Sequence, residues 1–265
     1  MIQVLFNTFL QFFLSIGDYV TMILDSFKDS FRKFPEWALI REQLFSIGVM
    51  SLGVVAITGM STGVVLAAQS IYQLSSKGLA GITGVMVAKS MITELGPVLT
   101  AFMVTGRVGA SICAELGTMK VTEQIDAIKS MAVNPNSYLI APRLLAGIIM
   151  VPLLTIFSIM MGIAGGYLLS TFFFHLSAAS YFNPMPFHIT YFDLLTGFVK
   201  SFTFGLLLTT ISCYKGMKTK GGAEGVGKAT TASVVISYVS ILISDFLLTI
   251  ALNSLHLKIK FDWYI

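Results

Sequence analysis

The sequence predicts an all-α membrane protein: an N-terminal interfacial helix, five membrane-spanning helices, and a cytosolic helix between spans 2 and 3. Of its 265 residues, 55% are hydrophobic and 11% are charged, whereas a soluble domain carries about 25% charged residues. Five apolar runs are long enough to cross a bilayer. The net charge of +4 comes from Lys and Arg at the ends of these runs. Because they form no basic patch, the composition argues against nucleic-acid binding.

Residues 1–40 form the first predicted region, an interfacial amphipathic helix followed by a basic linker. Apolar residues recur at helical spacing between Leu5 and Phe27, but Asp18 and Asp25 make residues 1–27 a poor span. We expect this helix to lie in the membrane interface, with a first span or signal anchor as the alternative. It lacks the basic start and the cleavage site of a signal peptide.

Residues 41–265 form the second predicted region, a five-span domain. The spans are expected at about 44–74, 81–106, 144–172, 192–213 and 229–252. The first and third contain glycines four residues apart, at Gly59 and Gly63 and at Gly162 and Gly166, which let helices approach closely. Residues 173–191 are expected to form a loop.

The orientation follows from the unequal distribution of basic residues among the loops. One set of loops holds Lys28, Arg32, Lys33, Arg41, Arg107, Lys120, Lys129, Arg143, Lys215, Lys218, Lys220 and Lys228. The opposite set holds Lys77, Lys258 and Lys260. Since loops rich in Lys and Arg stay in the cytosol, the N-terminus and the 107–143 loop are predicted to be cytosolic. The C-terminal tail, with Trp263 and Tyr264 as interfacial anchors, is predicted on the far side.

Five charged residues lie in or at the edge of the apolar runs: Lys89, Glu94, Asp193, Lys200 and Asp245. A charge at mid-span costs about 2.5–3.5 kcal/mol on insertion scales. Following each helix from its predicted side places all five between mid-membrane and the far surface. We therefore expect a polar cavity that opens away from the cytosol. Internal ion pairing that only holds helices together is the alternative, and the two are compatible.

Gly96 and Pro97 follow Glu94 directly. Because Pro97 cannot donate a hydrogen bond to the carbonyl of Thr93, we expect the second span to bend there. Such a bend would widen the space beside Glu94. A tolerated kink without a role is the alternative.

The loop between spans 2 and 3 has the pattern of an amphipathic helix from Glu115 to Met131. Its charged residues are Glu115, Lys120, Glu123, Asp126 and Lys129, interleaved with apolar residues. Acids and bases are balanced, which favours docking into a protein groove over resting on a lipid surface. The helix is expected to end before Asn134 and Pro135.

No catalytic or metal site is predicted. The stretch Gly222–Lys228 is similar to a phosphate-binding loop, but Ala229 replaces the hydroxyl residue that holds magnesium and no strand precedes it. We interpret it as a flexible cytosolic loop. The three histidines lack metal-ligand spacing. Cys113 and Cys213 lie near cytosolic span ends, so we expect free thiols.

Several segments closely resemble the MlaE-type permease family. They are Glu94-Leu95-Gly96-Pro97, Gly106-Arg107-Val108-Gly109-Ala110, Ala114-Glu115-Leu116-Gly117, Thr122-Glu123-Gln124-Ile125-Asp126-Ala127, Met131-Ala132-Val133-Asn134-Pro135 and Pro142-Arg143. The resemblance covers about residues 40–255. It implies a membrane subunit of an ABC transporter that moves phospholipids between the two membranes of diderm bacteria.

The resemblance also implies partners. A homodimer in the bacterial inner membrane is expected to bind a cytosolic ABC ATPase, which holds ATP and Mg, through a coupling helix within 115–131. A ring of MCE-domain proteins on the periplasmic side and a STAS-domain protein are further expected partners. The chain itself is expected to hold no cofactor and to catalyse no reaction.

Charged cavity residues of the family match Glu94, Asp193, Lys200 and Asp245. Some members carry Arg before the Glu, where this chain has Thr93, which leaves open whether Lys89 supplies that charge. Lys89 or Lys200 would offer positive charge to a lipid phosphate. A non-transporting scaffold that recruits cytosolic proteins through the 115–131 helix is the main alternative. A secondary transporter would show inverted repeats, which are not apparent.

Overall fold

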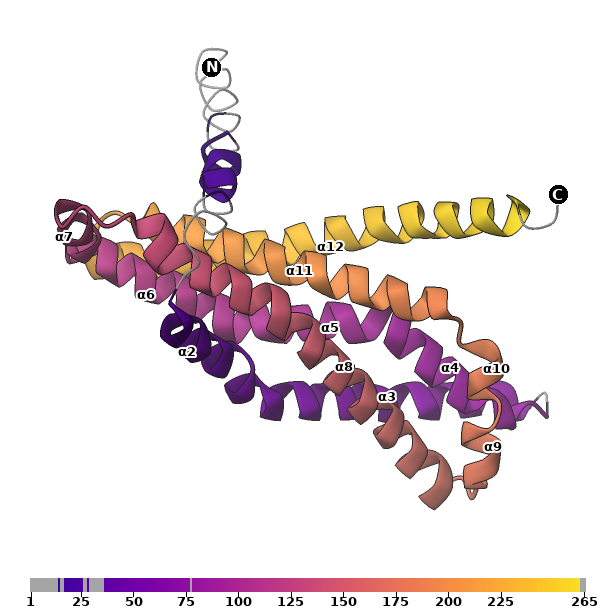
Figure 1. Ribbon diagram of the computed structural model, residues 1–265. Helices are drawn as coiled ribbons and strands as arrows, with labels where there is room; N and C mark the ends of the chain where they lie inside the picture. The colour runs from indigo at the N-terminus through magenta and orange to yellow at the C-terminus, as the bar shows by residue number, and fades with distance from the viewer. Residues whose placement is uncertain (1–13, 15–16, 26–27, 29–35, 77, 263–265) are drawn as a thin grey trace, which may run out of the picture.

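The computed structural model describes residues 14, 17–25, 28, 36–76 and 78–262. These residues are mostly helical and contain no strand (Figure 1). Five helical stretches are long and apolar enough to cross a membrane: Trp37–Ser75, Ala80–Val121, Asn136–Phe172, Tyr191–Met217 and Gly222–Lys258. The predicted all-α, five-span fold is confirmed. The anchor expected at 263–264, and most of the interfacial helix expected at 1–27, lie outside the described residues.

The stretches divide into shorter elements. In order they are α2 (Trp37–Ile47), η1 (Val49–Ser51), α3 (Leu52–Ser75), η2 (Ala80–Ile82), α4 (Thr83–Ser90), η3 (Met91–Leu95), α5 (Gly96–Val104), η4 (Thr105–Gly109), α6 (Ala110–Val121), α7 (Gln124–Ser130), η5 (Asn136–Ile140), α8 (Ala141–Phe172), α9 (Ala178–Phe182), α10 (Met185–His188), α11 (Tyr191–Met217) and α12 (Gly222–Asp262). The region expected as a loop at 173–191 thus contains the two short helices α9 and α10. All five spans exceed their predicted bounds, because polar residues continue the helices beyond the apolar runs.

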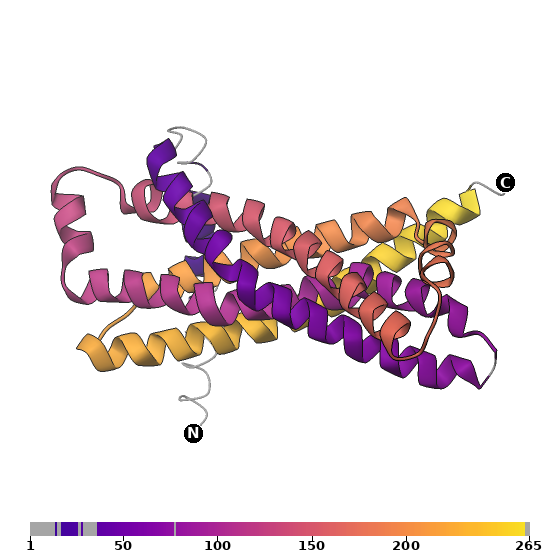
Figure 2. The same ribbon diagram turned by 90° about the horizontal axis from the view of Figure 1, so that it is seen from below.

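Small residues let α3 and α8 cross in close contact (Figure 2). A Cβ atom on Gly59 would meet Ser158, and one on Gly63 would overlap the backbone carbonyl of Gly162. The close approach that the glycine spacing predicts is therefore present, and it is made with the backbone of the other helix.

We expect Gly63→Ala to destabilise the protein by about 1–3 kcal/mol, because the added methyl meets backbone that cannot move aside. Gly53→Ala on the same helix is the matched control, since a Cβ there meets nothing within 4 Å. Thermal unfolding in detergent measures both. An equal midpoint for the two variants would contradict this account of the α3–α8 crossing.

The second span departs from α-helical geometry just before Gly96 and Pro97. Residues Met91–Leu95 form the π-helical segment η3, and the backbone N–H of Gly96 donates to the carbonyl of Met91. Pro97 then lies in the first turn of α5, where a missing N–H costs little. An irregularity is thus present where the sequence predicts one, and it takes the form of a π-helical turn that contains Glu94.

The expectation of one helix from Glu115 to Met131 is wrong. Helix α6 ends at Val121, and Glu123 adopts a left-handed backbone with φ 61° before α7 begins. This turn lays α7 across the end of the bundle (Figure 2) and buries Ile125 with Leu116 and Leu139. A single straight helix would leave the Ile125 side chain in solvent. Burying this apolar side chain against the rest of the chain therefore favours two helices over one.

The interpretation of Gly222–Lys228 as a flexible loop is also wrong. These residues form the first turns of α12, and the carboxylate of Glu224 pairs with the Lys228 ammonium at 2.6 Å. Gly221 and Gly222 have positive φ angles, 90° and 66°, so the tight turn is confined to Gly221 and the first residue of the helix. The whole stretch is helical, so it lengthens the last span at the end of the bundle where α7 lies.

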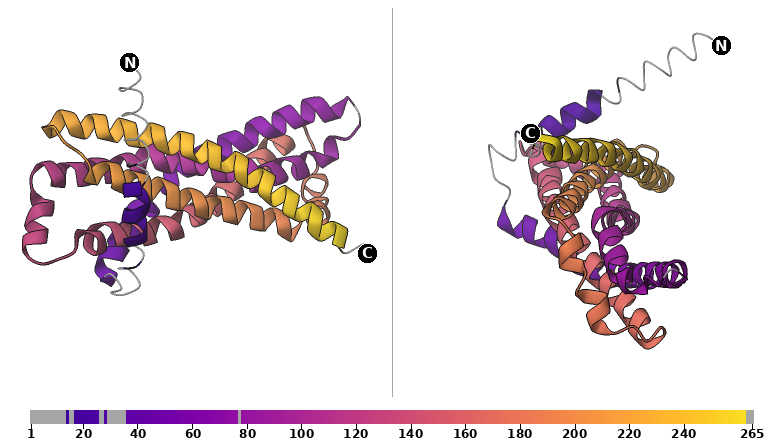
Figure 3. Two further views of the ribbon diagram at one scale, coloured as in Figure 1. Left: turned by 90° about the horizontal axis from the view of Figure 1, so that it is seen from above. Right: turned by 90° about the vertical axis from the view of Figure 1, so that its right-hand side faces the viewer.

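The two ends of the bundle differ. Helix α7 lies at one end, whereas α9, α10 and the end of α12 lie at the other (Figures 1 and 3). The described helical residues 17–25 contact the last turns of α11: Tyr19 shares a 2.6 Å hydrogen bond with Thr210. Asp18 accepts from Lys218 at 2.7 Å, and this bond raises the pKa of Lys218. The N-terminal segment is therefore docked on α11 toward the α7 end.

Candidate functional site

Three of the five predicted charged residues meet inside the bundle. Lys200 of α11 is fully buried, and its ammonium donates to a carboxylate oxygen of Glu94 and, at 2.8 Å, to the hydroxyl of Thr249. Its third partner is Asp245 of α12. The ammonium nitrogen and a carboxylate oxygen of Asp245 are 2.9 Å apart and form an ion pair, but their angles do not fit a hydrogen bond. Three acceptors thus surround the three donors that an ammonium offers. We call these four residues the Lys200 cluster.

The Lys200 cluster joins three spans and carries one excess negative charge. Glu94 comes from η3 in the second span, Lys200 from the fourth and Asp245 from the fifth. A buried ammonium is tolerated only when it is paired and hydrogen-bonded, which this arrangement provides. The side chain of Glu94 is 41% exposed, so one face of the cluster is open. The internal ion pairing that the sequence left as an alternative is present, and the cavity role remains a prediction.

Lys89 and Asp193 form a separate pair nearer the α9–α10 end. Their charged groups are 3.5 Å apart, and half of the Lys89 side chain is exposed. Asp193 also caps α11 by accepting from the N–H and the hydroxyl of Thr190, each at 2.9 Å. Lys89 therefore does not join Glu94, and the hydroxyl of Thr93 bonds only to the carbonyl of Lys89.

The two lysines differ in what they can offer a ligand. The Lys200 ammonium donates hydrogen bonds to Glu94 and Thr249 and is ion-paired with Asp245. Its side chain is fully buried, so a phosphate cannot reach it in this conformation. Lys89 is accessible, and its one acid partner is already satisfied by the cap of α11. Of the two, Lys89 is the residue that can meet an external anion.

The predicted coupling residues lie at the α7 end and form two groups. Asp126 of α7 pairs with Lys120 of α6 at 2.8 Å and with Lys129 at 3.5 Å. The hydrogen bond from Lys120 lowers the pKa of the Asp126 carboxyl, so this link persists until the pH falls below the ordinary range of Asp. Together these contacts hold the corner between α6 and α7. Glu123 forms the corner itself.

Glu115 belongs to the second group, with a residue that the sequence analysis missed as a site. It pairs at 2.9 Å with Arg143, whose side chain is 5% exposed and which also donates to the carbonyl of Leu139. Arg107 was missed likewise: its guanidinium donates at 2.7 Å to the hydroxyl of Ser51. Both arginines belong to the segments that resemble the MlaE-type family. That position in the sequence could have identified them as candidate site residues.

Thr249 of the Lys200 cluster was also missed. It follows Asp245 by four residues and so lies on the same face of α12. Among the described residues, no three His, Cys, Asp or Glu side chains gather as a metal site. The thiols of Cys113 and Cys213 are free and buried, as predicted.

These features define a multi-pass membrane protein with a charged cluster inside its helix bundle. The chain belongs to the MlaE permease family: the family model described as Permease MlaE matches residues 40–251. It is 42% identical over 212 residues to a probable ABC transporter permease protein of Rickettsia typhi, covering 80% of this chain and 82% of the relative.

Two further relatives have more specific names. The chain is 35% identical over 244 residues to the intermembrane phospholipid transport system permease protein MlaE of Haemophilus influenzae, covering 91% of this chain and 92% of that protein. It is also 36% identical over 213 residues to the chloroplast protein TRIGALACTOSYLDIACYLGLYCEROL 1 of Arabidopsis thaliana, covering 80% of this chain and 61% of that protein.

Proposed function

We propose that this chain is the permease subunit of an ABC transporter that moves phospholipids between the inner and outer membranes. Its family membership and the name of the Haemophilus relative support this assignment. The observation that carries it is the Lys200 cluster, because a buried ion cluster across three spans is costly unless it serves a polar substrate or a moving part. ATP hydrolysis belongs to a separate subunit, and this chain needs no catalytic residue.

The proposed assembly is a homodimer in the bacterial inner membrane, with its N-terminus cytosolic and its C-terminus periplasmic. Helix α12 is the least buried of the five spans, and its exposed apolar residues offer a surface for a second copy. The α7 end would meet the cytosolic ATPase. An MCE-domain protein ring at the α9–α10 end and a STAS-domain protein complete the proposal.

The second span offers a direct mechanical route between the two ends. From Glu94 in η3 the chain continues as helix through α5, η4 and α6 to Val121, at the corner with α7. A displacement of α7 by an ATPase would therefore reach the Lys200 cluster along one helical rod. Arg107 ties this rod to the first span through Ser51.

Lys89 is proposed to meet the lipid phosphate. We expect Lys89→Gln to raise the lipid concentration needed for half-maximal transport by about tenfold, since a charge-assisted hydrogen bond contributes about 1.5–3 kcal/mol. The maximal rate and the folding of the permease should change little. ATP-driven transfer of fluorescent phospholipid from vesicles that hold the permease–ATPase complex measures both quantities. Lys258→Gln, an exposed lysine at the far end of α12, is the matched control.

The same assay separates the two candidate functions. A transporting permease predicts ATP-dependent transfer by the wild-type complex. The scaffold alternative predicts that the chain binds the ATPase but transfers no phospholipid, whichever lipid is supplied. That result would contradict the transport proposal.

A further inference from the structure

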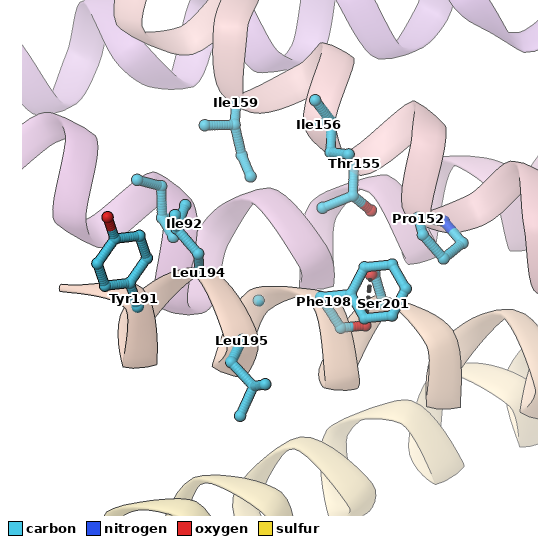
Figure 4. Close-up of a pocket in the computed structure, with 11 residues that line it drawn as sticks. Ile92, Pro152, Thr155, Ile156, Ile159, Tyr191, Leu194, Leu195, Phe198 and Ser201 are labelled. Atoms are coloured by element: carbon cyan, nitrogen blue, oxygen red, sulfur yellow. Dashed lines mark hydrogen bonds between the residues drawn. The ribbon is translucent and has the colours of Figure 1, made fainter. Parts of the chain in front are cut away.

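A groove of about 400 Å³ lies between α8 and α11. On α8 it is lined by Pro152, Thr155, Ile156 and Ile159, and on α11 by Tyr191, Leu194, Leu195, Gly197, Phe198 and Ser201 (Figure 4). Ile92 of η3 lines it between the two helices. At Gly197, α11 packs directly on the backbone of η3, because a Cβ there would overlap the carbonyl of Ile92.

The residues that line the groove are mostly apolar and favour an apolar ligand. None of the lining residues is charged. The hydroxyl of Thr155 donates to the carbonyl of Val151, and that of Ser201 donates to the carbonyl of Phe198, both at 2.9 Å. The third hydroxyl of the lining belongs to Tyr191, the first residue of α11. Since the other two are satisfied within their own helices, the groove presents hydrocarbon beyond this outer end.

The length of the groove matches one leaflet. It begins at Tyr191, the first residue of α11, and reaches Ser201, a distance of about 15 Å along a helix. The hydrocarbon core of a bilayer is about 30 Å thick. The groove therefore extends from the surface on the α9–α10 side to about the middle of the membrane.

The residues beside the groove form an apolar surface. Leu153 and Met160 on α8 and Phe202 on α11 are exposed, and all three belong to spans. Within a bilayer, hydrocarbon chains are what surrounds such a surface, so the groove opens toward acyl chains.

We propose that the α8–α11 groove holds one acyl chain of a phospholipid from the leaflet on the α9–α10 side. This site is distinct from the Lys200 cluster, whose residues do not line the groove. The site does not require that the protein transport lipid. In the proposed orientation the bound lipid belongs to the periplasmic leaflet, the one a lipid crossing to or from the outer membrane must pass through.

Tryptophan quenching by brominated phospholipid tests this site. The groove reporter is Phe198→Trp, made in a chain whose Trp37 and Trp263 are replaced by Phe. The control reporter is Phe202→Trp in the same background, at an exposed phenylalanine on the same helix that does not line the groove. Dibrominated phosphatidylcholine is titrated into the full-length protein in detergent micelles. We expect saturable loss of emission from the groove reporter with one lipid per chain, and weak, non-saturating loss from the control reporter.

A second pair of variants guards against indirect effects. Ile156→Phe adds bulk inside the groove and should weaken quenching of the groove reporter. Leu153→Phe, on the same helix but outside the groove, should leave it unchanged. Equal, linear quenching of both reporters would show ordinary contact with bulk lipid and overturn the proposal. Absence of quenching at the groove reporter, because a second copy of the chain covers the groove, would overturn it as well.

Discussion

Replacing Lys200 by Met is expected to lower the free energy of unfolding by about 3–5 kcal/mol, because it removes one partner of a buried ion cluster. The two carboxylates of Glu94 and Asp245 would then face each other without the ammonium that separates them. Reversible unfolding in mixed micelles, followed by circular dichroism, measures the loss.

The matched control for that change is Lys89→Met. Lys89 also pairs with a carboxylate, but half of its side chain is exposed, and exposed pairs contribute about 0–1 kcal/mol. We expect a small change in stability for this variant. If Lys200→Met proved as stable as Lys89→Met, the Lys200 cluster would not hold the three spans together in the way described.

Glu123→Pro is expected to reduce lipid-stimulated ATP hydrolysis by the permease–ATPase complex by about tenfold or more, within the usual range of coupling energies between sites. Glu123 has φ 61°, whereas proline requires φ near −65°. Proline also removes the N–H that donates to the carbonyl of Lys120 at 3.3 Å. The corner between α6 and α7 would be lost while the spans remain intact.

The variant Glu123→Gly distinguishes the effect of the backbone turn between α6 and α7 from the effect of the Glu123 carboxylate. Glycine adopts a positive φ without strain, so this variant keeps the turn and removes the carboxylate. We expect near wild-type coupling from it. Full activity of Glu123→Pro would show that α7 does not carry the signal from the ATPase. A loss in Glu123→Gly equal to that in Glu123→Pro would assign the role to the carboxylate instead.

Much of the fold could be predicted because apolar length and charge spacing are local properties. The five spans, a close helix approach at Gly59 and Gly63, and the identity of the charged residues inside the spans all follow from sequence windows. The partner helix at the glycines, α8, does not. The cost of a charge at mid-span was enough to single out Glu94, Lys200 and Asp245 before their contacts were known.

The pairing within the site could not be predicted, because it depends on the rotation and tilt of each helix. The sequence left open whether Lys89 supplies a positive charge to the site of Glu94, and in the structure Lys89 pairs with Asp193. The break at Glu123 was missed for a similar reason. The pattern of charges from 115 to 131 is helical throughout, and only the burial of Ile125 by residues elsewhere in the chain favours two helices over one.

The most direct test of the proposed function is ATP-driven phospholipid transfer by a variant whose Lys200 cluster is neutral. Glu94→Gln, Lys200→Met and Asp245→Asn together remove all three charges, and such neutral replacements of buried ion groups often preserve stability. We predict a folded complex that binds its ATPase but transfers phospholipid at less than about a tenth of the wild-type rate. Transfer at the wild-type rate by this variant would contradict the claim that the cluster takes part in moving lipid.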